Sequence, residues 1–139
     1  MLYETDIIKW VEQQVSLIKE QRYTEVDWNN VLEEIEDLGK RERDRFLSSI
    51  RLIIQHLLKW EYQPERRSRS WEVTIKRERN NLKRYLRDTP SLKRYWQDLS
   101  KFYGDARADA ANETGISDWN FPDNCPYSSE QIKTDWFPE

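Results

Sequence analysis

Apolar residues recur at intervals of three and four positions along most of the chain, the spacing of one face of an α-helix. A first helix is predicted after Thr5 or Asp6, either of which can cap it. A second, short and acidic, follows Asp27 and reaches Gly39, a residue that ends a helix or lets it bend. The stripe of the first helix consists of Ile7, Trp10, Val11, Gln14 and Ile18, and that of the second of Trp28, Val31, Leu32, Ile35 and Leu38.

A longer helix is predicted from about Lys40. Its apolar arc is wide enough to be buried on more than one side, so we expect it to be the central helix. It should stop near Tyr62, since Pro64 disfavours a helical conformation in the residue before it. Ser68 or Ser70 then caps a fourth helix. The arc of the central helix contains Phe46, Leu47, Ile50, Ile53, Ile54, Leu57 and Leu58, and the core face of the fourth contains Trp71, Ile75, Leu82, Tyr85 and Leu86.

A last long helix is predicted from Thr89 or Ser91 to Gly115. The remainder, residues 116–139, holds five large aromatic residues and three prolines, so it cannot be one long helix. We expect an aromatic strap packed on the helices, with a short helix capped at Ser128. The fold class is therefore all-α, a bundle of four to five helices with an irregular aromatic C-terminal strap, and residues 1–139 form a single helical domain.

The composition indicates one core that is built from few apolar residues, many of them aromatic. Hydrophobic residues make up 37% of the chain and charged residues 35%, and the seven Trp, seven Tyr and four Phe compensate because each ring buries a large area. No stretch has the length and hydropathy of a membrane span, and the N-terminus lacks the pattern of a signal peptide. The single Cys125 excludes an internal disulfide. A cytoplasmic protein with no membrane partner is expected.

Charge is strongly segregated along the chain. Residues 1–39 carry 3 basic and 10 acidic side chains, residues 40–103 carry 18 and 8, and residues 104–139 carry 2 and 8. The basic middle either meets an anionic partner or is neutralised by the acidic ends within one compact fold.

Three arginines stand just before the fourth helix, where a cation opposes the helix dipole: Arg66, Arg67 and Arg69. They need an anion, which is either a partner's phosphate or carboxylate or the acidic second helix of the same chain. Further cations share the exposed face of the fourth helix. The predicted binding surface consists of Arg66, Arg67, Arg69, Lys76, Arg77, Lys83 and Arg84.

A few polar residues fall on or beside apolar stripes: Gln14, Glu34, His56, Glu78 and Glu113. One carboxylate per helix is typical of metal sites in bundles, but those sites also use Glu-x-x-His pairs, which this chain lacks. The favoured interpretation is that Glu78 and Glu113 pair with arginines and that His56 packs against Trp60. No metal and no cofactor are expected.

Motifs for covalent or phosphate chemistry are absent: there is no phosphate-binding glycine loop, serine elbow or zinc-type cysteine pair. Cys125 lacks a nearby histidine in sequence and is interpreted as a small packed hydrophobe. An enzyme is therefore less favoured than a binding protein.

Four blocks carry a family resemblance: EEIEDLGKRER, HLLKWEYQPERRSRSW, the PSL before the last helix, and FPDNCPY. They resemble the signature blocks of the bacterial domain-of-unknown-function family 29, over nearly the whole chain. The resemblance implies an all-helical, bundle-like fold and implies no activity.

These observations favour a small cytoplasmic interaction or accessory protein that binds another macromolecule, most simply a protein, through the basic surface. A nucleic-acid-binding protein and a metal-dependent enzyme with a carboxylate and histidine site are the alternatives, and a homodimer stays open.

Overall fold

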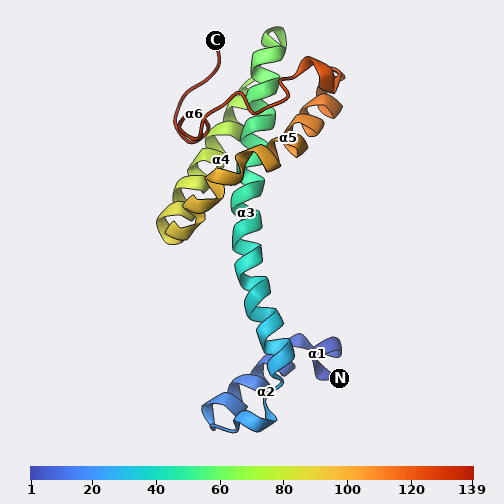
Figure 1. Cartoon of the computed structure of the whole chain (residues 1–139), viewed down its shortest axis with the longest axis vertical. Coiled ribbons are helices and arrows are strands. Elements are labelled where there is room, and N and C mark those ends of the chain that lie inside the picture. Colours follow the sequence, from blue (N-terminus) through green and yellow to red (C-terminus); the bar gives the residue numbers. More distant parts are fainter. The chain divides into compact units, whose positions relative to one another are not determined.

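The computed structural model describes residues 1–139, and all its regular elements are helices (Figure 1). The all-α prediction is confirmed. The α-helices are α1 (Leu2–Thr5), α2 (Ile7–Lys19), α3 (Trp28–Tyr62), α4 (Arg69–Asp88), α5 (Leu99–Thr114) and α6 (Ser129–Lys133). Short 3-10 helices lie at Tyr23–Glu25, Pro64–Arg66, Pro90–Asp98 and Asp118–Asn120.

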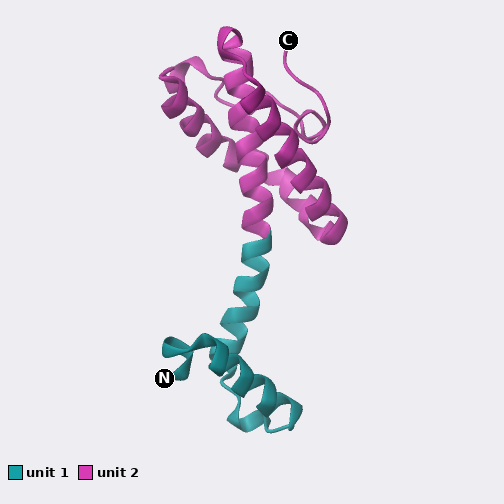
Figure 2. Ribbon diagram, turned by 180° about the vertical axis from the view of Figure 1, so that it is seen from behind, with its two compact units in different colours: residues 1–42 teal, residues 43–139 magenta.

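The chain divides into two compact units, residues 1–42 (unit 1) and residues 43–139 (unit 2), and the division falls within α3 (Figure 2). Unit 1 contains α1, α2 and the start of α3, and unit 2 contains the rest of α3 and all later elements. The expectation of one domain over residues 1–139 stays a prediction.

Helix α3 corrects the prediction of two separate helices, because it runs without interruption through Gly39. A glycine inside a helix costs only about 1 kcal/mol relative to alanine. The charged residues that follow, Lys40 to Arg45, include good helix formers, so the helix continues. Its C-terminal end at Tyr62 agrees with the prediction, since Gln63 before Pro64 leaves the helical conformation.

The core of unit 2 is built around the second half of α3. Six apolar side chains there are fully buried: Phe46, Ile50, Ile53, Ile54, Leu57 and Leu58. Side chains of α4 and α5 complete this core, among them Ile75, Leu82, Tyr103, Ala106 and Ala110. The wide apolar arc of the central helix thus reflects burial against several neighbours.

Residues Pro90–Asp98 correct a second prediction, because they form a 3-10 helix in place of the start of the last α-helix. Leu92 and Tyr95, three positions apart, pack against the core. A spacing of three suits both helix types, so the apolar pattern could not separate them. The α-helix begins at Leu99 and ends, as predicted, before Gly115, which has a φ of 75° that favours glycine.

The strap, residues 116–139, lies on the core of unit 2. Phe121, Tyr127 and Ile132 are buried in it, and Trp136 and Phe137 are partly buried. Helix α6 begins with a capping box in which the Ser128 hydroxyl accepts a hydrogen bond from the backbone N–H of Gln131. The prediction that the aromatic rings of the strap pack on the helices is wrong for Trp119, which is 88% exposed.

Candidate functional site

Unit 1 is held together by polar contacts between α2 and the turn that precedes α3. The Asp6 carboxylate caps α2 by accepting a hydrogen bond from the backbone N–H of Lys9. The backbone N–H of Asp27 donates to Gln14 Oε1 at 2.7 Å. The Asp27 carboxylate accepts from Trp10 Nε1 at 3.2 Å and from the side chain of Asn30 at 2.8 Å. The hydrogen bond from Asn30 contributes most to lowering the pKa of Asp27, and the bond from Trp10 adds to it.

Gln14, predicted to be a polar group on an apolar stripe, therefore has a structural role. It is buried and fixes the start of α3 against α2. Glu34, the second such group in unit 1, accepts a hydrogen bond from the Tyr3 hydroxyl at 2.7 Å. This bond is the main reason why the pKa of Tyr3 is raised to about 12.

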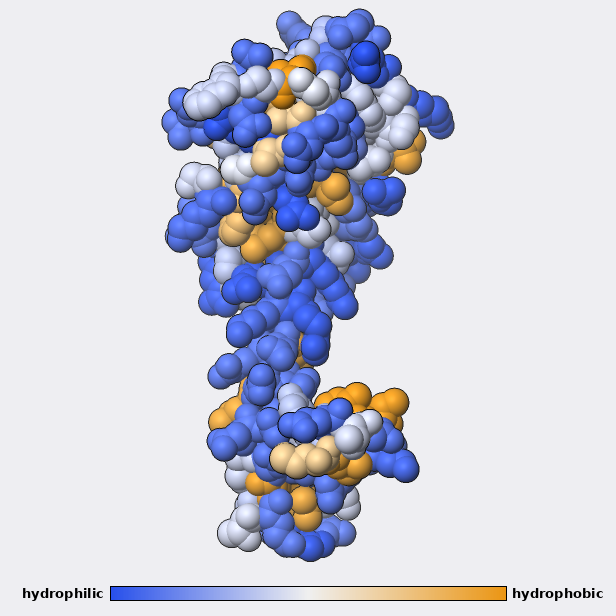
Figure 3. Space-filling model, turned by 90° about the vertical axis from the view of Figure 1, so that its right-hand side faces the viewer, coloured by the Kyte–Doolittle hydropathy of each residue, from blue (hydrophilic) through white to orange (hydrophobic).

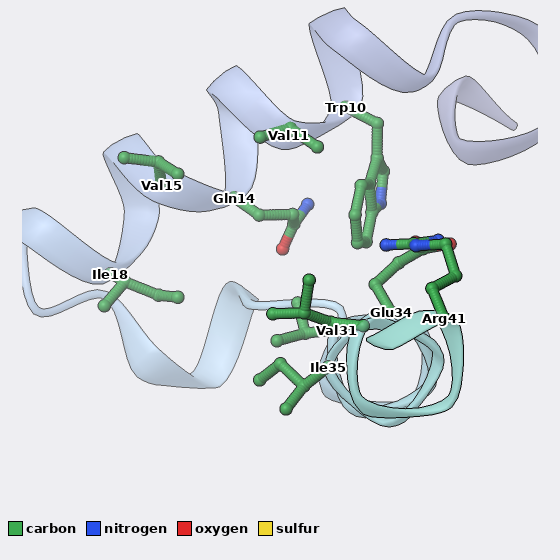
Figure 4. A pocket seen from close by; sticks show the side chains of 10 residues that line it. Trp10, Val11, Gln14, Val15, Ile18, Val31, Glu34, Ile35 and Arg41 are labelled. Carbon is green, nitrogen blue, oxygen red and sulfur yellow. The ribbon is translucent and has the colours of Figure 1, made fainter. Parts of the chain in front are cut away.

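An open apolar groove lies between α2 and the start of α3, with a volume of about 260 Å3. In Figure 4, α2 runs across the view and α3 is seen nearly end-on, and the side chains of both helices point into the space between them. We call this the unit 1 groove; its lining consists of Trp10, Val11, Gln14, Val15, Ile18, Val31, Glu34, Ile35, Leu38 and Arg41. A second hollow of about 340 Å3, lined by Ile7, Ile8, Val11 and Glu12, adjoins it at Val11.

Apolar side chains are exposed around this groove to an extent that unit 2 does not match. Figure 3 shows hydrophobic residues gathered on the surface of unit 1. Only Trp10, Gln14 and Val26 are buried in this unit. Its exposed large hydrophobic side chains, apart from Met1, are Ile7, Ile8, Val11, Val15, Ile18, Tyr23, Trp28, Leu32, Ile35 and Leu38. Unit 2 exposes only Tyr62, Val73 and Trp119. Exposure of so many large apolar side chains on one small unit is typical of an interaction site.

The arginine cluster predicted from sequence is only partly available to a partner. Arg66 and Arg69 are exposed. Arg67 is half-buried and donates through Nε to the Trp60 carbonyl at 2.8 Å and through Nη2 to the Glu139 carbonyl at 2.8 Å. Its guanidinium also lies over the Trp60 ring, 5.0 Å from the centroid. Arg67 thus has backbone acceptors within unit 2.

The four α4 cations of the predicted binding surface are exposed, and three of them have neighbours on their own helix. Lys76 Nζ lies 2.8 Å from Glu72, Arg77 Nε lies 3.7 Å from Glu78, and Arg84 donates to Asn81. Lys83 is exposed. Exposed ion pairs contribute little to stability, so these side chains can still meet an anion.

Glu78 is buried and accepts hydrogen bonds from Ser49 Oγ at 3.1 Å and Asn81 Nδ2 at 3.0 Å. These two hydrogen bonds hold its carboxylate, and the Arg77 guanidinium lies farther away, at 3.7 Å. Glu78 therefore joins α4 to α3 through Ser49. The predicted arginine partner is Arg77, but the contact between them is long.

The sequence interpretation missed Arg79, which is only 3% exposed. Its guanidinium donates to three backbone carbonyls around the strap: Ile132 at 2.8 Å, Gln131 at 2.8 Å and Trp136 at 2.6 Å. Burial lowers the pKa of Arg79. A signal existed, since residue 79 lies four positions after Ile75 and three before Leu82, in the middle of the buried stripe.

His56 and Glu113 belong to a separate cluster in unit 2. His56 is buried, and its Nδ1 lies 2.9 Å from the Leu52 carbonyl; burial is the main reason why its pKa is lowered. Glu113 accepts a hydrogen bond from Lys59 Nζ at 2.6 Å, which lowers the pKa of Glu113. Lys59, also missed from sequence, is buried and lies over the Trp71 ring. The partner of Glu113 is thus a lysine and not the arginine expected.

No group of three or more His, Cys, Asp or Glu side chains is placed to hold a metal ion. Cys125 is half-buried, with Sγ 3.4 Å from the Tyr127 carbonyl, and burial raises the pKa of its thiol.

The elements and contacts described define an all-α protein with an aromatic strap and an open apolar groove. The chain belongs to the family described as "Domain of unknown function DUF29", whose model matches residues 2–137. No curated protein and no solved structure matches the chain. No helix has both the length and the apolar character that crossing a membrane requires.

Proposed function

We propose that this chain is a small interaction or accessory protein that binds another protein through the unit 1 groove. The observation that carries the proposal is the exposure of ten large apolar side chains on a unit of only 42 residues. Burying such side chains against a partner is favourable by about 1.5–3 kcal/mol each when burial is complete. Few soluble proteins leave so much apolar surface uncovered without a binding role.

The groove supports the proposal better than the basic surface expected from sequence. Arg67 already binds the end of the strap, and Val73 is the only large apolar side chain exposed on α4, so the basic surface offers a partner little apolar area. A cytoplasmic location is part of the proposal and agrees with a single free cysteine.

A nucleic-acid-binding protein is the second candidate, and the exposed cations Arg66, Arg69 and Lys83 favour it. Such binding would depend steeply on salt, because each phosphate contact releases counterions.

We expect co-purification from the native cell to separate the two surfaces. Replacing two exposed groove residues, Ile35→Ser with Leu38→Ser, should reduce the recovered partner protein about tenfold or more, because it removes apolar area from the contact. The matched pair Lys83→Ala with Arg84→Ala should leave recovery unchanged. The reverse pattern, or nucleic acid that copurifies with the wild type and is lost with the alanine pair, would move the function to the α4 surface.

A further inference from the structure

The unit 1 groove has the form of an incomplete helical layer. Helices α2 and α3 each turn an apolar stripe toward the space between them, and Val11, Ile35 and Leu38 remain exposed there. Helices with apolar stripes are stable when another element covers the stripe. A third helix laid into the groove would cover both stripes at once, which is a recurring mode of peptide recognition.

The net charge of unit 1 indicates which charge the bound helix carries. Residues 1–42 contain 11 acidic and 5 basic side chains. Glu12 lines the hollow next to Val11, and Glu34 is the carboxylate that lines the groove itself. Glu12 is exposed and Glu34 is half-buried. Arg41 is the only cation that lines the groove. A helix with basic residues flanking its apolar stripe complements the negative net charge of this unit.

A second copy of the chain fits less well. Two copies of unit 1 would bring two strongly acidic surfaces together, and like charges at an interface are unfavourable. The exposed surface of α4 is basic, but its only exposed large apolar side chain is Val73. No helix of unit 2 therefore offers a second copy an exposed apolar stripe to place in the groove.

We infer that the occupant of the unit 1 groove is a positively charged amphipathic α-helix from a partner protein. This inference rests on the proposed function and specifies its ligand. Helix α2 has 13 residues, which corresponds to a length of about 20 Å. The occupant is then a helix of about four turns, with apolar anchors three and four residues apart and Lys or Arg beside them.

The test is a titration of the full-length chain with three fluorescent peptides of about 15 residues, a length of about four helical turns. The first places Leu on one helical face and Lys on the other. The second has the same spacing with Glu in place of Lys, and the third is a scrambled version of the first without a helical stripe. We expect the Leu/Lys peptide to bind about tenfold or more tightly than either of the others.

Substitutions in the groove test which residues contact the Leu/Lys peptide. Ile35→Ser with Leu38→Ser should weaken binding of the Leu/Lys peptide about tenfold or more, whereas Val73→Ser, at a residue 48% exposed in unit 2, should not change it. Glu12→Gln with Glu34→Gln should weaken binding several-fold at low salt, and the difference should shrink as salt screens the charges. The control pair Glu65→Gln with Asp105→Asn, two exposed acids of unit 2, should have no effect.

Three results would overturn the inference. Equal or tighter binding of the Leu/Glu peptide would exclude a basic ligand. Equal binding of the scrambled peptide, unaffected by the serine pair, would show that the groove is not the site. A dimer in sedimentation that the serine pair dissociates would identify a second copy as the occupant. If the peptides fail but the serine pair still abolishes co-purification, the proposed function stands and only this ligand is wrong.

Discussion

Deleting the strap, residues 116–139, is expected to lower the free energy of unfolding by several kcal/mol. The deletion uncovers the core at Phe121, Tyr127 and Ile132, all buried. It also removes the hydrogen bond from the Tyr127 hydroxyl to Glu61 Oε2, 2.6 Å long, and that from the Tyr103 hydroxyl to the Pro122 carbonyl. Loss of one buried aromatic side chain alone costs about 3–5 kcal/mol. Thermal unfolding should show a melting temperature lower by about 10 °C or more.

Two single variants on the strap provide a matched comparison. Phe121→Ala should cost about 3–5 kcal/mol, because the ring is 2% exposed and packs near Tyr62. Trp119→Ala removes a larger ring that is 88% exposed, and should change stability by less than about 0.5 kcal/mol. Equal effects of the two variants, or an unchanged melting temperature after the deletion, would show that the strap does not lie on the core.

Arg79→Ala is expected to destabilise the protein by about 3 kcal/mol or more in denaturant unfolding. Hydrogen bonds from a charged donor contribute about 1.5–3 kcal/mol each, and the variant leaves the carbonyls of Gln131, Ile132 and Trp136 without this donor. The aliphatic part of the side chain also packs in the interior, and its loss adds to the effect.

Arg77→Ala is the control, because it removes the same side chain two positions away on the exposed face of α4. The Arg77 side chain is 58% exposed, and its ion pair with Glu78 has an N–O distance of 3.7 Å. Its loss should cost less than about 1 kcal/mol. A cost for Arg79→Ala no greater than that of Arg77→Ala would contradict the role of Arg79 in holding the strap.

The helices were largely predictable because local physics determines their ends. Asp6, Ser68 and Ser128 cap helices where hydroxyl or carboxylate oxygens precede an apolar stripe. Pro64 and Gly115 mark ends for equally local reasons. The two errors, a break at Gly39 and an α-helix over Pro90–Asp98, arose where the local preference is weak. Neighbouring residues or tertiary packing then decide the conformation.

The polar interactions were harder to predict than the helices. Arg67 and Arg79 bind backbone carbonyls of the strap, and neither the sequence spacing nor the charge pattern identifies a carbonyl as the partner. An arginine is rarely buried, so the residue type of Arg79 gives no indication of this role. Its position in the apolar stripe was the better guide.

The unit 1 groove could not be predicted from the sequence. An apolar stripe indicates that one face of a helix is buried, but it does not indicate whether the same chain or a partner buries it. Ile7, Val11, Ile18, Ile35 and Leu38 lie on the apolar stripes of the first two predicted helices, yet all are exposed. Only the placement of α2 against the start of α3 distinguishes a core from a groove.

Photo-cross-linking in the native cell tests the central claim most directly. A photoreactive phenylalanine analogue in place of Ile35, 60% exposed in the groove, should cross-link to another protein, at a basic segment with an apolar helical stripe. The same analogue in place of Val73, on α4, should give no such product. Cross-links from position 35 that reach only this chain or a second copy of it, or no product above that from position 73, would contradict the claim.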